Sequence, residues 1–211
     1  MNSHFVVSLY CLTSTLNEEW VLWEHKASES KNANNWKDNM MALSKFTTVE
    51  QFWKYINFIP TPSQVFFDGS YRTKVDNKTI EEYSLFKKNI EPEWGDPANV
   101  VGGEWQCRQC LDSESLDLQW QNILLSAIGE TMEEIIEAPD GTKSLSSVIN
   151  GVRVVDKSRA FPLFRFEIWL STSDGAVRDR VKDRLEEIVT QGQSLANRKQ
   201  APSKWEWKDH S

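Results

Sequence analysis

Apolar and polar residues follow two different periods along the chain, and these periods predict strands and helices in mixed order. From Phe164 to Leu170 every second residue is apolar, and Arg165, Glu167 and Trp169 lie between them. A period of two predicts a strand that has these three side chains on one face. Short apolar segments predict further strands at residues 20–25, 104–110 and 148–156 and around Trp205 and Trp207.

Three other segments have the helical period of about 3.6 residues. The first is capped by Thr47 or Thr48, is ended by Pro60 and Pro62, and has a regular apolar stripe: Val49, Phe52, Trp53, Ile56 and Ile59. The second starts at Ser113 or Ser115 and continues to about Glu134, and the third covers about Gly175 to Thr190. Interleaved strands and helices predict an α+β domain whose helices cover one face of a sheet and leave the other free.

The remaining segments predict the domain limits. We expect a flexible N-terminal arm at residues 1–15, a single domain over 16–211, a polar loop at 28–35 and an insertion near 64–82. No segment has the roughly 18 apolar residues of a membrane helix, and we expect no signal peptide. The pair Cys107 and Cys110 has no second ligand pair for zinc, so we predict reduced thiols, no metal, no cofactor and a cytoplasmic protein.

Charge narrows the class of ligand. The net charge is −7, which argues against a protein that coats nucleic acid through charge alone. Residues 151–211, however, carry twelve Lys and Arg against nine Asp and Glu. An anion site is therefore expected to be local and to lie in this last part of the chain.

Ten tryptophans are far more than a chain of 211 residues usually has. Four of them, Trp20, Trp23, Trp105 and Trp120, lie in predicted strands or helices and are expected to pack. Trp36 and Trp94 lie instead in polar loops. Such indoles are either exposed or form a clamp for a planar, preferably cationic, ring. The spacing alone leaves both possibilities open.

The order of several motifs resembles the cap-binding translation initiation factor 4E family over about residues 16–208. The segments that carry the resemblance are Trp20-Val-Leu-Trp23, Asn35-Trp36, Phe46 to Trp53, Tyr83-Ser-Leu-Phe86, Ile90-Glu-Pro-Glu-Trp94, Gly102-Gly-Glu-Trp105, Trp120 to Glu130, Val152-Arg153 and Ile168-Trp169. The resemblance implies a curved antiparallel sheet with three long helices on its convex face and a cap slot on the concave side.

It also implies roles for the residues of that slot. Trp36 and Trp94 would stack on the 7-methylguanine base, and Trp169 would contact its methyl group. Arg153 and Arg165 would hold the phosphates, with help from two basic residues of the following loop, Lys157 and Arg159. A methylated guanine is cationic, and two indole faces favour such a ring.

The sequence departs from the family pattern beside the second stacking residue. The family has a glutamate there that binds the guanine edge, whereas this chain has Gly95. We expect Asp96 to replace it, with Glu93 as the next candidate. A family phosphate-binding lysine aligns near Val155. Such departures resemble those of divergent protist paralogues, including those of kinetoplastids, whose caps are more heavily methylated.

The family's partner surface is also partly present. Val49, Trp53 and Leu125 match it on the first two predicted helices, whereas Gln121 replaces a leucine. Thr15 lies where the family has a His-Pro-Leu segment. The resemblance implies that scaffold initiation factor 4G or 4E-binding proteins dock a helical segment there.

We therefore predict an mRNA 5′-cap-binding translation initiation factor that is not an enzyme, is not bound to membranes and is monomeric outside its complexes. Two alternatives are kept. One is a regulatory or scaffold module of the same fold with weak cap affinity. The other is a hydrolase of capped nucleotides, although no nucleophile–base pair or metal-binding carboxylate cluster supports it.

Overall fold

The computed structural model describes residues 13–27, 39–132, 136–137, 143–144, 147–192 and 204–211. Its larger sheet is antiparallel throughout and has the order β10-β5-β9-β8-β4-β1-β2, with β3 paired to β4. These strands are β1 (Thr15–Lys26), β2 (Met40–Thr48), β3 (Lys74–Val75), β4 (Lys78–Lys87), β5 (Gly103–Gln109), β8 (Ile149–Asp156), β9 (Phe164–Leu170) and β10 (Glu206–Asp209). A separate pair comprises β6 (Ile136–Glu137) and β7 (Lys143–Ser144).

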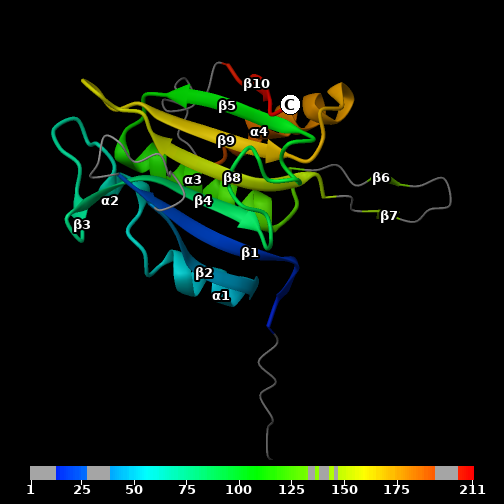
Figure 1. Ribbon diagram of the computed structural model, residues 1–211, viewed down its shortest axis with the longest axis horizontal. Helices are drawn as coiled ribbons and strands as arrows, with labels where there is room; N and C mark the ends of the chain where they lie inside the picture. Colours follow the sequence, from blue (N-terminus) through cyan, green and yellow to red (C-terminus); the bar gives the residue numbers. More distant parts are fainter. Residues whose placement is uncertain (1–12, 28–38, 133–135, 138–142, 145–146, 193–203) are drawn as a thin grey trace, which may run out of the picture.

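The described helices lie against one face of the curved sheet (Figure 1). They are α1 (Val49–Ile56), α2 (Pro62–Val65), α3 (Ser113–Ile128) and α4 (Gly175–Ile188). The expected α+β architecture is confirmed, but only α3 and α4 are long, because α1 has eight residues and α2 four. None of these helices is long and apolar enough to cross a membrane.

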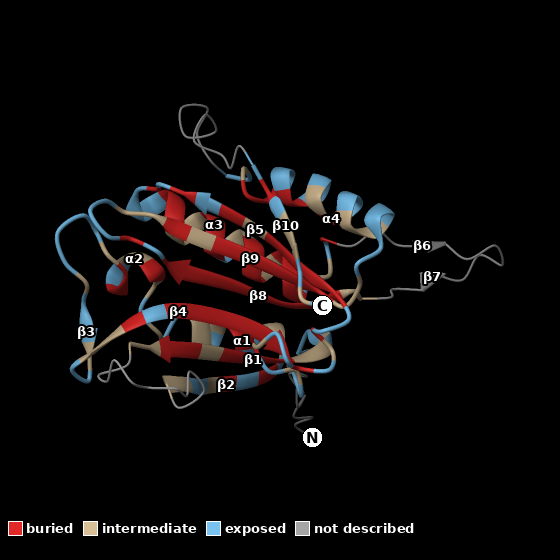
Figure 2. Ribbon diagram, turned by 45° about the horizontal axis from the view of Figure 1, so that its top comes forward, coloured by how far each residue is buried: buried red, intermediate tan, exposed pale blue. Residues whose placement is uncertain are grey.

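The core lies between the helices and the sheet. Figure 2 shows buried residues on the strands and on the helix sides that face them. From β9, Phe166 and Ile168 belong to this core together with Val152 and Val154 of β8. Arg165, Glu167 and Trp169 point to the other face. There the Glu167 carboxylate contacts both of the other two side chains. The period of two therefore identified the faces of β9 correctly.

Helix boundaries differ from the prediction at several positions. Thr48 caps α1 as expected, and its hydroxyl accepts a hydrogen bond from the Gln51 amide. The cap of α3 is Asp112 rather than a serine, because its carboxylate accepts from the Ser115 amide at 2.7 Å. α3 also ends at Ile128, before Gly129, and does not continue to residue 134.

The segment near 64–82, for which an insertion was predicted, contains the end of α2, the short strand β3 and the beginning of β4. β2 and most of β4 were not predicted as strands. β4 is buried on both faces from Glu82 to Lys87, so it lacks the alternation of a half-exposed strand. Its polar residues at the same time break the continuous apolar run that marks a fully buried strand.

Candidate functional site

A pocket of about 380 Å³ lies at one end of the sheet face that carries no helices. Its lining comes from the loop between β4 and β5 and from two central strands: Pro92, Glu93, Trp94, Gly95, Arg153 and Trp169. Trp94 is 49% exposed, whereas Trp169 is fully buried. Four residues that were predicted from three separate motifs, Glu93, Trp94, Arg153 and Trp169, thus line one pocket.

Tight packing of the strands brings Trp169 to the floor of this pocket. Trp169 is paired with Gly151 of β8 in the register, and its ring meets Phe86 of β4 edge-on, with 5.4 Å between centroids. A Cβ atom at Gly151 would lie 2.4 Å from the Phe86 ring. Glycine is therefore required at position 151 for β4 and β9 to place these rings together.

Arg153 connects the strands beneath the pocket through ion pairs. Its guanidinium lies 3.2 Å from the Glu82 carboxylate and 3.4 Å from that of Glu167. It also donates to the Pro92 carbonyl and lies over the Trp169 ring at 4.8 Å. Burial alone would lower the pKa of Arg153, but the two carboxylates outweigh it and raise the pKa. The cation expected to hold phosphate is thus already paired with carboxylates.

The two acids of this cluster are buried, and their environments differ. Glu167 accepts from the Trp169 indole at 3.0 Å and pairs with Arg165 at 2.5 Å. Burial raises the pKa of Glu82 to about 7, although Arg153 opposes this shift. The cluster therefore holds an acid that changes its charge near neutral pH.

Arg165 and Lys157 are two further cations beside this cluster, and both are accessible to solvent. The Arg165 side chain is 20% exposed, and Lys157 follows β8 in the loop to β9. Burial first and the nearby positive charge of Arg165 second lower the pKa of Lys157. Arg159 is exposed two residues further along the same loop. Like charges held together in this way favour the binding of an anion.

The loop that bears Trp94 is ordered by its own polar side chains. Asp96, the first candidate to bind the guanine edge, is buried and accepts hydrogen bonds from the amides of Glu91 and Ala98, each at 2.8 Å. It does not line the pocket, whereas Glu93 does. The position of Asp96 therefore favours Glu93, the second candidate. Trp36 lies outside the described residues.

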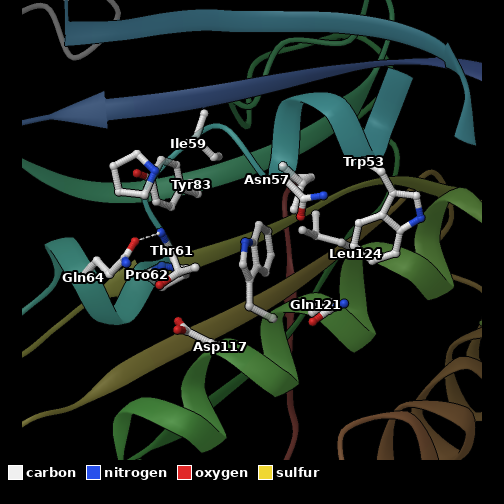
Figure 3. Close-up of a pocket in the computed structure, with 13 residues that line it drawn as sticks. Trp53, Asn57, Ile59, Thr61, Pro62, Gln64, Tyr83, Asp117, Gln121 and Leu124 are labelled. Atoms are coloured by element: carbon white, nitrogen blue, oxygen red, sulfur yellow. Dashed lines mark hydrogen bonds between the residues drawn. The ribbon is translucent and has the colours of Figure 1, made fainter. Parts of the chain in front are cut away.

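The opposite face of the molecule has a groove of about 300 Å³ between α1 and α3. Trp53 projects from α1 across this groove towards Gln121 and Leu124 of α3 (Figure 3). The far end is formed by the turn from Asn57 to Pro62. Trp53 is half-buried, and it meets Phe52 edge-on with ring centroids 5.1 Å apart. Its ring therefore packs partly on the core and partly faces the groove.

The other predicted partner residues lie along the same two helices or beside them. Val49 begins α1 one turn before Trp53, and Thr15 is paired with Thr48, the cap of α1. Leu125 is half-buried on α3 next to Leu124. Of the predicted partner residues, Trp53 and Gln121 line the groove, whereas Thr15, Val49 and Leu125 lie outside its lining.

The cysteines do not form a site in the described part of the chain. Cys107 is buried and Cys110 is exposed, and both are free thiols. Burial raises the pKa of the Cys107 thiol to about 12. No group of three potential metal ligands was found among the residues that the structure describes.

Comparison with known proteins identifies the family. The family model "Eukaryotic initiation factor 4E" matches residues 15–211. The chain belongs to the eukaryotic initiation factor 4E family. The factor 4E of Eremothecium gossypii is 30% identical over 178 residues, which cover 84% of this chain and 72% of that protein. The factor 4E of Saccharomyces cerevisiae is 28% identical over 174 residues, covering 82% and 70%.

Solved structures of factor 4E proteins share the fold. Ascaris suum eIF4E-3 in complex with an m2,2,7G cap has a TM-score of 0.66 and 25% identity, and the match covers 92% of this chain and 98% of that one. Caenorhabditis elegans eIF4E-3 with the 4E-binding protein Mextli has a TM-score of 0.65 and 23% identity. The match covers 92% of this chain and 99% of that one. Members of the factor 4E family are cap-binding factors and not enzymes, so the hydrolase alternative is set aside.

Five acidic or basic side chains of the site were not predicted from the sequence. They lie in the buried polar cluster or beside Trp94: Glu82, Glu104, Glu167, Lys208 and His210. Only Glu167 gave a signal, because the alternation in β9 placed it between Arg165 and Trp169. The others come from strands far apart in the sequence.

Proposed function

We propose that this factor 4E protein binds the 5′ cap of mRNA through the pocket beside Trp94 and acts in translation initiation. The observation that carries the proposal is the pocket itself, because it joins a half-exposed indole, a buried indole and Arg153, which Glu167 links to Arg165. The complex of the Ascaris relative with a methylated cap supports the same ligand class.

The base is proposed to stack on Trp94, with Trp36 as the second indole. Stacking on an aromatic ring contributes about 1–3 kcal/mol per base, and a cationic base gains more. Trp169 lies at the pocket floor, where the methyl group would reach it. Glu93 is the carboxylate we assign to the guanine edge, because Asp96 is held by amides of its own loop.

The phosphates are proposed to bind mainly Arg165, Lys157 and Arg159. Arg165 and Lys157 lie close enough for one charge to lower the pKa of the other, and an anion between them would relieve this repulsion. Arg153 is assigned a supporting role, since Glu82 and Glu167 already compensate its charge. It holds the Pro92 carbonyl and the Trp169 ring in place.

Retention on immobilised 7-methyl-GTP tests this proposal. We expect the protein to bind the resin and to elute with free 7-methyl-GTP but not with GTP. Trp94→Ala should abolish retention, whereas Phe58→Ala, which removes another highly exposed aromatic side chain, should be retained like the wild type. Equal elution by GTP would contradict recognition of the methylated base.

The groove at α1 and α3 is proposed to bind a partner helix. Trp53, Ile56 and Ile59 are half-buried and offer apolar surface, and an amphipathic helix buries such surface with apolar residues one turn apart. The complex of the C. elegans relative with Mextli supports a 4E-binding protein as the partner class, and the scaffold factor 4G is the other candidate. We infer a monomer outside such complexes.

A regulatory module with weak cap affinity remains the second candidate function. Two observations favour it: Gly95 lies where the family has its base-binding glutamate, and Arg153 is paired with carboxylates. The two functions differ in one measurable respect. A regulator of this kind would capture partners through Trp53 while binding 7-methyl-GTP no better than GTP.

A further inference from the structure

The strand β10 and the residue that follows it bring two basic side chains to Trp94. Lys208 and His210 lie two residues apart, so they project to the same side of the chain. The Lys208 ammonium is 3.4 Å from the centroid of the Trp94 ring. The His210 ring is stacked with Trp94 at 5.9 Å and 28°, and it meets Trp169 at 4.4 Å and 56°. Trp94 is thus in contact with two residues far away in sequence.

Hydrogen bonds determine the protonation state of His210. Nδ1 lies 3.1 Å from the carbonyl oxygen of Asn99, and Nε2 lies 3.1 Å from the carboxylate of Glu104. A carbonyl oxygen only accepts, and so does an ionised carboxylate. Both ring nitrogens must therefore carry a proton if Glu104 is charged. Burial would raise the pKa of Glu104, but the hydrogen bond from His210 lowers it overall, which agrees with an imidazolium–carboxylate pair.

The same contacts control the loop that carries Trp94. The Asn99 side chain donates to the carbonyls of Glu91 and Glu93, each at 2.9 Å. These two carbonyls belong to the segment just before Trp94. His210 binds the backbone of Asn99, and its own amide donates to Gly102 at 3.1 Å. Asn99 and its hydrogen bonds therefore connect His210 to the backbone just before Trp94.

The pocket lies away from these contacts. Trp94 lines it, but neither Lys208 nor His210 is among its lining residues. We propose that His210 and Lys208 are positioning residues, which fix the Trp94 indole from one side so that its other side is ready to stack on a base. This inference rests on the proposed function. A preformed stacking surface raises affinity because less conformational entropy is lost when the ligand binds.

The proposal implies that ligand affinity depends on the proton shared by His210 and Glu104. A neutral imidazole has one N–H and would lose one of its two hydrogen bonds. The charged groups near this pair come from three strands: Glu104 of β5 contacts the ring at 3.1 Å, and Arg153 of β8 and Lys208 of β10 join His210 in lowering the pKa of Glu104. Raising the pH should therefore loosen the Trp94 loop and weaken binding.

Titrations with 7-methyl-GTP test this inference through matched variants. His210→Ala should weaken binding roughly fivefold to tenfold. In Glu104→Gln the amide can donate to a neutral His210, so the hydrogen bonds persist without a proton. The wild-type affinity divided by that of Glu104→Gln should therefore fall from about pH 6 to about pH 9. Both proteins bind the same ligand, so titration of the ligand cancels in this ratio.

Glu206→Gln is the control, because it makes the same change on β10 at an exposed residue. This variant should follow the wild type at every pH. A constant ratio between the wild type and Glu104→Gln, or undiminished affinity in a folded His210→Ala, would overturn the inference.

Nitrogen-15 NMR of the His210 ring gives a readout that needs no ligand. Both ring nitrogens should have the shifts of protonated imidazolium at neutral pH in the wild type, and one should lose its proton in Glu104→Gln. A neutral tautomer in the wild type would contradict the inference. If no variant binds 7-methyl-GTP but the imidazolium is present, the proposed function fails while the His210–Glu104 pair stands.

Discussion

The pocket beside Trp94 and the groove beside Trp53 are built from opposite kinds of side chain. Under the pocket, Glu82, Arg153 and Glu167 form buried ion pairs across β4, β8 and β9. The groove is lined by apolar side chains of α1 and α3 and by polar ones that include a single carboxylate, Asp117. Charge changes should therefore damage the pocket, whereas loss of apolar surface should damage the groove. Each of the following variants tests one side of this contrast.

The largest effect is expected when the ion pairs lose their most connected acid. Glu167→Ala removes a carboxylate that pairs with Arg153 and Arg165 and accepts from Trp169. A buried cation that loses a partner costs about 3–5 kcal/mol. Urea unfolding should show this loss for Glu167→Ala but almost none for Glu186→Ala on the exposed side of α4. Similar stabilities would mean that the cluster is not a structural unit.

The next effect concerns Glu82 and its pH dependence. The folded pKa is about 7 and the ordinary value is 4.5, so the folded state binds the proton more tightly between these pH values. Stability should therefore fall as the pH rises from about 4.5 to about 7, by on the order of 2–3 kcal/mol. Glu82→Gln should lose this component, and Glu81→Gln, on the exposed neighbour, should keep it. If the stability of the wild type and of Glu82→Gln changes with pH in the same way, the raised pKa of Glu82 is refuted.

Loss of apolar surface at the groove should lower the affinity for a partner and leave the stability of the fold almost unchanged. Trp53→Ala is expected to reduce the affinity for a 4E-binding helix by about 2 kcal/mol or more, because the indole is only half-buried and faces the groove. Melting temperature and 7-methyl-GTP retention should remain close to the wild type. Tyr71→Ala, which removes an exposed aromatic residue outside the groove, is the control for the binding assay. If Trp53→Ala unfolds or still binds the helix normally, the groove assignment is wrong.

The smallest effect is expected at the phosphate end of the pocket. Arg165→Ala should weaken binding of 7-methyl-GTP by about 1.5–2 kcal/mol and should affect 7-methylguanosine little. The affinity of Arg165→Ala for 7-methyl-GTP should also depend less on salt concentration than that of the wild type. Arg180→Ala removes an exposed cation from α4 and should change neither ligand. Equal losses for nucleotide and nucleoside would show that Arg165 acts on the fold and not on the phosphates.

Periodic sequence patterns predicted the faces of strands and helices, but they did not predict contacts between residues that are far apart in the sequence. The alternation in β9 and the apolar stripe of α1 gave the faces of Trp169 and Phe52 correctly. β4 was missed because it is buried on both faces yet contains charged residues. The pairing of Arg153 with Glu82 depends on register between β4 and β8, and the contact of His210 with Glu104 joins residues 106 apart. No local pattern encodes such contacts.

Cap recognition at the Trp94 pocket is tested most directly by calorimetric titration with 7-methyl-GTP and with GTP. We expect one site, much weaker binding of GTP, and a loss of about 1–3 kcal/mol in Trp94→Ala, while Phe58→Ala binds like the wild type. Equal affinities for the two nucleotides, or a folded Trp94→Ala with undiminished affinity, would contradict cap recognition at this pocket.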